Sequence, residues 1–531
     1  MKLLSLASSA KRSRSADDHE EAATDQTHAI ELQSLPSAGT NSTKRDAPRE
    51  NGLRAVDTSI SPQLTIQEER RLWKKVDARL LPMLTVVYLV SAFNQGIIVH
   101  ARSNNLEVGL NLTGSQFRIA LVMFTIPYCV FAIPSVILLR ILRPSRWFAA
   151  LTVTSGIVIT LSGLVESYAP LLGVRICLGA LEAGIFPGII YYLTLWYPRH
   201  LLHFRIALLF GAASVANSFS GLIAYGIGRM AGKGGLLGWS WIFILEGIVT
   251  VIVGVVAFFV LLDLPSTATA LSLEERAFIQ LRKKYDNSSV GEEEGLERRQ
   301  VIAALKDWQV WMHVLVLMSV LAPLAGVSLF IPSITRSWSH SPAVTQLLTV
   351  PPYIVAAIVM CIAAFYSDKL KMRFPVVLAG LVCCMIGFLM NICKLRSGVR
   401  YFGTFFIVIG SYSALPGSIA WLSNNLAGQS KRATGLALQI GVGNLSTAVV
   451  YTVYRQSDAP RYLLGHGVEL AFVGVGLLVL PVTVSVYTRI NGSRQAALRR
   501  RRLRGEGPEG RWTKEEMRML GDRAAEFKYT L

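Results

Sequence analysis

Long apolar runs recur along the chain between residues 80 and 488, and they constrain the fold more than any other feature. Each run has about 20 residues, the length at which an α-helix crosses the hydrocarbon core of a bilayer. Inside that core the backbone must satisfy its own hydrogen bonds, as a helix does. We therefore predict an all-α integral membrane protein, with transmembrane helices at residues 80–100, 117–139, 147–166, 170–196, 205–228, 240–262, 309–332, 343–366, 375–393, 401–424, 433–453 and 467–488.

The composition supports this class of protein. Hydrophobic residues make up 52% of the chain and charged residues 16%, against about 25% charged residues in soluble domains. The net charge of +19 could suggest a nucleic-acid partner, but much of the basic excess lies in tails and short loops, where it anchors a membrane protein. The six cysteines lie in apolar segments without a CxxC pair or metal-binding spacing. We expect no nucleic acid, metal or cofactor, and no enzyme activity.

A polar segment at residues 264–308 divides the predicted spans into two sets of six. This layout is typical of transporters in which one half rocks against the other around a central cavity near the bilayer midplane. We predict a first half at 67–263, a linker at 264–308 and a second half at 309–489. The polar tail 1–66 is expected to be disordered because it has too few apolar residues to form a core. The basic tail 490–531 closes the chain.

The positions of lysine and arginine predict the orientation. Basic residues precede the first span, follow the second, and occur in the linker and the C-terminal tail, which places both termini and the linker in the cytosol. The loop after the ninth span, with Lys394, Arg396 and Arg400, is an exception. Leu72 and Val76 recur at helical spacing among basic residues, which predicts an amphipathic helix at the inner leaflet before the first span.

The fourth predicted span, residues 170–196, carries two opposite charges, Arg175 and Glu182. Seven residues are about two helical turns, so both side chains lie on one face of a helix. Charges inside membrane spans are rare and costly, and they mark functional sites more often than not. The alternative is a fixed ion pair that ties helices together. We favour a functional role for the two charges.

Several segments from about residue 68 to the C-terminus resemble the major facilitator superfamily, and within it the fungal allantoate-permease branch of the anion:cation symporter family. They are RICLGALEAGIFPGIIYYLTLWYPRH at 175–200, GWSWIFILEGIVTVIVG at 238–254, QLLTVPPYIVA at 346–356, YSDKLKMR at 366–373, WLSNNLAGQSKRATGLALQIGVGN at 421–444 and DAPRYLLGHGVEL at 458–470. Members of this branch import small organic acids such as allantoate, nicotinate or pantothenate, usually with protons. The resemblance implies a small-molecule substrate, protons as the coupling ion, and the plasma membrane, with the vacuolar membrane as the alternative; we expect a monomer.

The resemblance also implies roles for the charged pair in the fourth span. Arg175 would hold a substrate carboxylate or pair with Glu182, and Glu182 would carry the proton. Burial without a partner disfavours a charged carboxylate, whereas a nearby guanidinium favours it. Movement of Arg175, or a substrate that occupies it, would therefore switch Glu182 between its charged and neutral forms.

The first span departs from the family pattern. Where relatives have an Asp and an Arg, this chain has the neutral amides Asn94 and Gln95, which can form hydrogen bonds but cannot titrate. The substrate is then less anionic than in relatives, or coupling rests on Glu182 alone or is absent, or His100 supplies a titratable group. Loss of transport activity is a further alternative.

Other polar residues of the spans are candidates for the wall of the cavity, with helix packing as the alternative for each. They are Asn217, Tyr353, Trp421, Asn424 and Gln439. Asp368 and Arg373 resemble the superfamily's inside-loop signature, which implies a gating latch that closes in one state and opens in the other. The rival functions are an uncoupled facilitator or exporter of a neutral or weakly charged metabolite, and a membrane sensor that does not transport.

Overall fold

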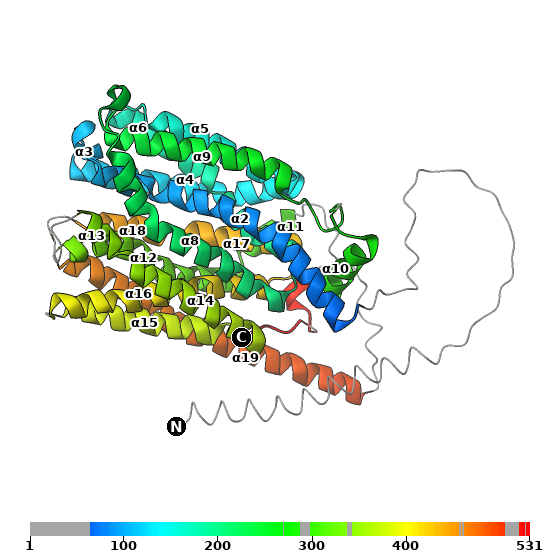
Figure 1. Cartoon of the computed structure of the whole chain (residues 1–531). Helices are drawn as coiled ribbons and strands as arrows, with labels where there is room; N and C mark the ends of the chain where they lie inside the picture. The colour runs from blue at the N-terminus through cyan, green and yellow to red at the C-terminus, as the bar shows by residue number, and fades with distance from the viewer. Residues whose placement is uncertain are drawn as a thin grey trace, which may run out of the picture. The chain divides into compact units, whose positions relative to one another are not determined.

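The computed structural model describes residues 64–268, 270–286, 298–336, 342–393, 395–455, 458, 461–504, 520–525 and 527–531. All of these residues belong to one compact unit, Ser61–Leu531. The regular elements in the described part of the chain are helices (Figure 1). Apart from its last three residues, the tail 1–66, which we predicted to be disordered, lies outside the described residues.

The first half begins with a long helix, α2 (Ile66–Ser103), whose N-terminus is capped by Thr65 in a capping box with Glu68. The segment that we expected as a separate amphipathic helix is the beginning of this same helix, because nothing interrupts the backbone before the first span. The other helices of this half are α3 (Leu106–Gly109), α4 (Gly114–Ile141), α5 (Pro144–Ser162), α6 (Tyr168–Glu182), α7 (Ile185–Trp196), α8 (Arg199–Gly228), η1 (Lys233–Gly235) and α9 (Gly238–Val260).

Two helices, α10 (Leu273–Asp286) and α11 (Arg298–Leu305), lie in the linker between the halves. The helices of the second half are α12 (Trp308–Arg336), α13 (Pro342–Leu347), α14 (Val350–Leu370), α15 (Phe374–Ile392), α16 (Ser397–Asn425), α17 (Gln429–Gly443), α18 (Leu445–Val453) and α19 (Leu463–Leu503). A short turn of helix, η3 (Gly521–Arg523), lies in the C-terminal segment.

Eleven helical segments in the described part of the chain are long and apolar enough to cross a membrane. The predicted third span corresponds to α5, which carries several Thr and Ser residues and packs along α9. Glycine makes this approach close, since a Cβ at Gly156 would lie 2.8 Å from the Gly247 carbonyl oxygen. With α5 included, six helices or helix pairs stand on each side of the linker, which confirms the predicted twelve-helix architecture.

Two of the spans are interrupted in the middle. The fourth span is α6 followed by α7, and the helix breaks directly after Glu182, at Ala183 and Gly184. A Cβ at Gly184 would lie 1.8 Å from the Ser135 Oγ atom, so the close approach of α4 at this point needs a residue without a side chain. The eleventh span breaks at Asn444, between α17 and α18. Ala183, Gly184 and Asn444 keep right-handed helical backbone dihedral angles, so neither span is unwound at its interruption.

One end of the helix bundle carries α10, α11 and the C-terminal residues 520–525 and 527–531, and is called the linker end below (Figure 1). These C-terminal residues pack there against the second half. Trp421 Nε1 and Asn425 Nδ2 donate to the Thr530 carbonyl oxygen at 2.9 and 3.0 Å. Lys431 forms a 2.6 Å ion pair with Asp522. Part of the predicted C-terminal tail is therefore bound to the bundle, and α19 extends the last span as far as Leu503.

Candidate functional site

A cavity of about 220 Å³ lies between the two halves. Its size is slightly below the range of about 300–1,000 Å³ that is typical of drug-sized ligands, which fits a small solute. The first half lines it with Tyr88, Ala92, Gln95, Leu121, Phe124, Thr125, Tyr128, Arg175, Phe186, Phe210, Ala213, Ser214 and Asn217. The second half lines it with Leu321, Leu324, Ala325, Ser328, Tyr412, Leu415, Asn444, Thr447 and Tyr451.

Arg175 is the charged residue in this wall, and α6 holds it there. Its side chain is 1% exposed. Its Nε atom donates to the Ala120 carbonyl oxygen at 3.4 Å, and its guanidinium carbon lies 5.1 Å from the centre of the Phe124 ring. Within the described residues, its Nη1 atom is buried without a hydrogen-bond partner. A guanidinium left partly unsatisfied beside a cavity is suited to an anionic ligand.

Glu182 is fully buried on the same helix and does not line the cavity. Ser91 Oγ on α2 donates to its Oε2 atom at 3.0 Å, while its Oε1 atom has no hydrogen-bond partner among the described residues. The structure describes both Glu182 and Arg175, and no ion pair joins them. The alternative of a fixed ion pair is therefore not the observed arrangement. A buried carboxylate with one hydrogen bond is costly when it is charged.

The two amides of the first span occupy different positions. Gln95 lines the cavity, and its side chain also approaches the Glu182 carboxyl group, so it connects the cavity with that acid. Asn94 is fully buried outside the cavity wall. It also approaches Glu182, and its Oδ1 atom accepts a hydrogen bond from Thr250 Oγ1 at 3.2 Å. Asn94 therefore belongs to the surroundings of the acid rather than to the cavity surface.

The remaining residues predicted for the cavity separate into two groups. Asn217 on α8 lines the cavity. Tyr353 lies behind the wall, where its ring packs edge-on against Tyr412 at 5.8 Å. Trp421 is fully buried near the linker end, with its ring 4.6 Å from that of His313. Gln439 donates to the carbonyl oxygens of His313 and Ser418 at 3.4 and 3.3 Å, which is a helix-packing contact.

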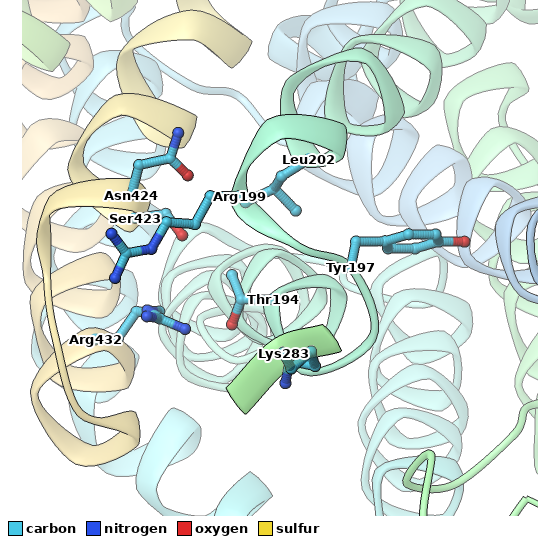
Figure 2. A pocket seen from close by; sticks show the side chains of 8 residues that line it. All are labelled: Thr194, Tyr197, Arg199, Leu202, Lys283, Ser423, Asn424 and Arg432. Atoms are coloured by element: carbon cyan, nitrogen blue, oxygen red, sulfur yellow. The ribbon is translucent and has the colours of Figure 1, made fainter. Parts of the chain in front are cut away.

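His100 and Asn424 also lie away from the cavity. His100 is half-buried near the end of α2, and its carbonyl oxygen accepts a hydrogen bond from Asn104. Asn424 lines a second, much smaller pocket of about 10 Å³ at the linker end, room for about one water molecule. Figure 2 shows how side chains from both halves surround it. Those side chains are Thr194, Tyr197, Arg199, Leu202, Lys283, Ser423, Asn424 and Arg432.

Asp368 and Arg373, which we predicted to form a latch, lie at the linker end and form a 2.6 Å ion pair. Both also reach the first half. The backbone N–H of Phe204 donates to Asp368 Oδ2 at 2.8 Å, and Arg373 Nη2 donates to the Arg199 carbonyl oxygen at 3.3 Å. Arg373 N–H also donates to the backbone oxygen of Leu531. The pair thus joins the halves and the C-terminal segment at one end of the bundle.

The sequence analysis did not single out Glu246, a second acid near Glu182. It lies on α9, and its Oε1 atom is buried without a hydrogen-bond partner among the described residues. The charges of the two carboxyl groups affect each other, so the acids are close in space. The signal was present in the quoted segment GWSWIFILEG, as a lone acid within an apolar span.

Comparison with known proteins agrees with this architecture. The family model described as Major Facilitator Superfamily matches residues 84–451. The high-affinity nicotinic acid transporter of Saccharomyces cerevisiae is 31% identical over 484 residues, which cover 91% of this chain and 88% of the relative. The major facilitator-type transporter hxnP of Emericella nidulans is 29% identical over 513 residues, 95% of this chain and 99% of the relative.

Among solved structures, the proton:xylose symporter XylE has a similar fold. Its TM-score with this chain is 0.58 at 14% sequence identity, and the match covers 78% of this chain and 96% of XylE. At that identity the likeness concerns the fold alone.

Proposed function

Because this chain belongs to the major facilitator superfamily, we propose that it is a proton-coupled secondary transporter of a small organic carboxylate. It works by alternating access and belongs to the allantoate-permease branch of the anion:cation symporters. The substrate class follows from the cationic cavity and from the relative named as a high-affinity nicotinic acid transporter. Nicotinate, a small aromatic carboxylate, is the first solute to test.

The observation that carries the proposal is Arg175. Its guanidinium is buried beside a cavity shared by the two halves, and its Nη1 atom has no hydrogen-bond partner in the part of the chain that the structure describes. A cation held inside a membrane protein without a counter-ion is costly. A substrate carboxylate offsets that cost, because two carboxylate oxygens match the geometry of the guanidinium donors. The ring of Phe124 and the surrounding apolar residues then contact the rest of the solute.

Glu182 carries the coupled proton. The acid lies on the same helix as Arg175, at the point where α6 ends, and Gln95 connects it with the cavity. When the substrate carboxylate neutralises Arg175, the buried Glu182 loses the benefit of that positive charge and takes up a proton. Substrate and proton therefore bind together, which is the requirement for symport.

Alternating access uses the contacts at the linker end. Asp368, Arg373 and the first-half groups that they reach close this end, and the ion pair opens when the halves rock. We assign the linker end to the cytosol, with both termini on that side, and the protein to the plasma membrane, with the vacuolar membrane as the alternative. In this orientation the described arrangement is closed toward the cytosol.

A facilitator of a neutral or weakly charged metabolite is the second candidate. The observation that favours it is Gln95, an amide in the cavity wall where the resemblance leads us to expect a charged residue. In that case Arg175 would hold a hydroxyl or carbonyl group of the solute, and no proton would move with it.

Uptake into vesicles reconstituted with the purified protein tests the proposal. Labelled nicotinate should accumulate above its external concentration when the outside is made acidic, and an ionophore that dissipates the gradient should abolish this accumulation. Equilibration without accumulation would support the facilitator. Binding of nicotinate without any flux would support the sensor, and neither binding nor flux with any small carboxylate would refute the substrate class.

A further inference from the structure

The second half contains a buried polar cluster that the proposed transport cycle does not use. It consists of Tyr454, which follows α18, and of His466 and Glu469, one turn apart on α19; we call it the second-half triad. Tyr454 Oη donates to Glu469 Oε2 at 2.6 Å and lies 2.9 Å from His466 Nδ1. His466 Nδ1 lies 3.9 Å from Glu469 Oε2. None of the three lines the cavity.

Apolar and aromatic side chains enclose most of the triad, and Tyr454 is 8% exposed. His466 and Glu469 are fully buried. The Phe330 ring stacks on Tyr454 and packs edge-on against His466 at 4.7 Å. Gly326 on α12 makes room for the acid, because a Cβ there would lie 1.4 Å from Glu469 Oε1. The neighbouring helices are thus shaped around a carboxyl group and an imidazole at this place.

Two polar atoms of the triad remain unsatisfied. Glu469 Oε1 and His466 Nε2 are buried without a hydrogen-bond partner among the described residues. An ionised carboxylate with a single hydrogen bond in an apolar interior is costly, and the cost falls when a proton neutralises it. The other titratable groups that face the triad from α16, α15 and the segment before α19 are Arg400, Cys384 and Tyr462.

The hydrogen-bond geometry allows one proton to be shared across the three groups. With the acid ionised and the imidazole protonated at both nitrogens, the phenol donates to the carboxylate and the Nδ1–H of the imidazolium donates to the phenol oxygen. If the phenol hydrogen moves to the carboxylate, the Nδ1 hydrogen replaces it on the phenol oxygen. An imidazolium and a carboxylate thereby become a neutral imidazole and a carboxylic acid, with no net change in charge.

The triad lies close to the cavity along the chain. Tyr454 comes three residues, about one helical turn, after Tyr451, which lines the cavity. Tyr451 in turn is close enough to Arg175 for the guanidinium charge to affect it. α18 therefore connects the triad with the substrate-binding wall.

We propose that Tyr454, His466 and Glu469 form a second proton-binding site, in the second half, which takes up one proton separately from Glu182. Its net charge changes from −1, with the acid ionised and the imidazole neutral, to zero when one proton binds. This inference goes beyond the proposed function, because it concerns proton binding by the protein itself and needs neither a particular solute nor coupled flux.

Infrared difference spectroscopy of the purified protein in lipid nanodiscs tests the inference without solute and without a gradient. Between acidic and alkaline pH, the unmodified protein should show a carboxylic acid band that Glu469→Gln removes and Glu182→Gln leaves in place. Direct proton titration should show about one proton fewer per molecule in Glu469→Gln. A Glu469→Gln spectrum identical to that of the unmodified protein would overturn the inference.

A second variant covers the case in which Glu469→Gln does not fold. Tyr454→Phe keeps the ring and removes the hydrogen bond to the carboxylate. A hydrogen bond to a charged group contributes about 1.5–3 kcal/mol, so the midpoint of the band should shift about tenfold or more toward lower proton concentration. An unchanged midpoint in Tyr454→Phe would show that the triad holds a fixed protonation state and would overturn the inference. Failure of the vesicle uptake experiment would leave both measurements unaffected.

Discussion

The two halves of this protein differ in the charge that they place in the wall of the cavity. In the first half, Arg175 and Glu182 lie on one helix without an ion pair between them, and Arg175 lines the cavity. Among the described residues, neither Arg175 Nη1 nor Oε1 of the further acid Glu246 has a hydrogen-bond partner. The first half therefore places one cation in the cavity wall and holds two acids, Glu182 and Glu246, outside that wall.

In the second half the buried basic residues Lys431 and Arg373 pair with acids and lie away from the cavity, and Glu469, whose Oε1 atom has no hydrogen-bond partner among the described residues, also lies outside the cavity wall. Lys431 forms ion pairs with both Asp307 and Asp522. Arg373 pairs with Asp368 at the linker end. The second-half wall of the cavity is apolar, hydroxyl, amide or aromatic. On the proposed function, the first half would recognise the charged groups, while the second half would supply the shape of the cavity and the closing contacts.

The largest effect is expected from removal of the cavity cation. Arg175→Gln should weaken nicotinate binding by about 100-fold or more, because truncation of one partner of a buried charge pair costs about 2–5 kcal/mol. Isothermal titration calorimetry of the purified protein measures it. Tyr451→Phe, the matched change in the facing wall of the second half, should cost no more than about fivefold. Equal losses of nicotinate affinity in the two variants would show that the two halves do not differ in how they bind the carboxylate.

A second cation in the first-half wall of the cavity should increase the preference for more negatively charged solutes. Gln95→Arg places a second cation in the cavity and should raise the preference for dicarboxylates over monocarboxylates by about tenfold. Gln95→Glu, the control of opposite charge, should lower it. Competition of unlabelled acids with labelled nicotinate gives both ratios, and a ratio that neither variant changes would show that this position does not set selectivity.

The contact between the halves at the linker end should have a smaller effect. Asp368→Asn weakens the ion pair with Arg373 and the hydrogen bond from Phe204, so the closed arrangement should lose about 1 kcal/mol, or about fivefold in population. Distances between spin labels on α8 and α14 at this end report the population. Lys369→Gln, one residue along the same helix and exposed, is the control and should leave the distances unchanged.

The smallest effect is expected at Glu275 in the linker. Partial burial raises the pKa of Glu275, but the hydrogen bonds from Lys75 and the Ser272 N–H and the nearby positive charges outweigh it, so its pKa lies below the ordinary value. The ionised Glu275 therefore stabilises the folded state fully above the ordinary carboxyl pKa of about 4.3. This stabilisation is lost as the pH falls through the lowered pKa that Glu275 has in the folded state.

Lys75→Met should remove most of the effect of Glu275 on the pH dependence of stability. The free energy of unfolding should change by less than about 1 kcal/mol, because the Lys75–Glu275 pair is partly exposed. Thermal unfolding measured between neutral and acidic pH checks it. If the variant and the unmodified protein lose stability in parallel over the acidic range, the pair contributes nothing.

The sequence predicted the spans and the position of Arg175 because apolar length and a charge inside a span are strong signals. It could not predict which polar residues face the cavity, because this depends on the rotation of each helix against its neighbours. Asn94 and Gln95 are adjacent in the chain, yet only Gln95 lines the cavity. Gln439 and Trp421 likewise point into helix contacts.

Two further features depend on contacts between residues far apart in the chain. The C-terminal segment docks on the linker end through Asp522 and Thr530, whereas from its polar sequence we predicted only a basic tail. The fixed ion pair that we considered for Arg175 and Glu182 fits their spacing on one helix face, but the side chains take other partners, Ala120 and Ser91. Spacing alone does not choose among partners contributed by other helices.

The central claim is that Glu182 carries the proton that drives solute uptake. The most direct measurement compares two fluxes of nicotinate in the same reconstituted vesicles, accumulation driven by an imposed pH gradient and exchange of labelled for unlabelled solute without one. Glu182→Gln should abolish accumulation and retain exchange, because the amide preserves the shape of the site and cannot release a proton. Accumulation at the unmodified level in Glu182→Gln would contradict the account.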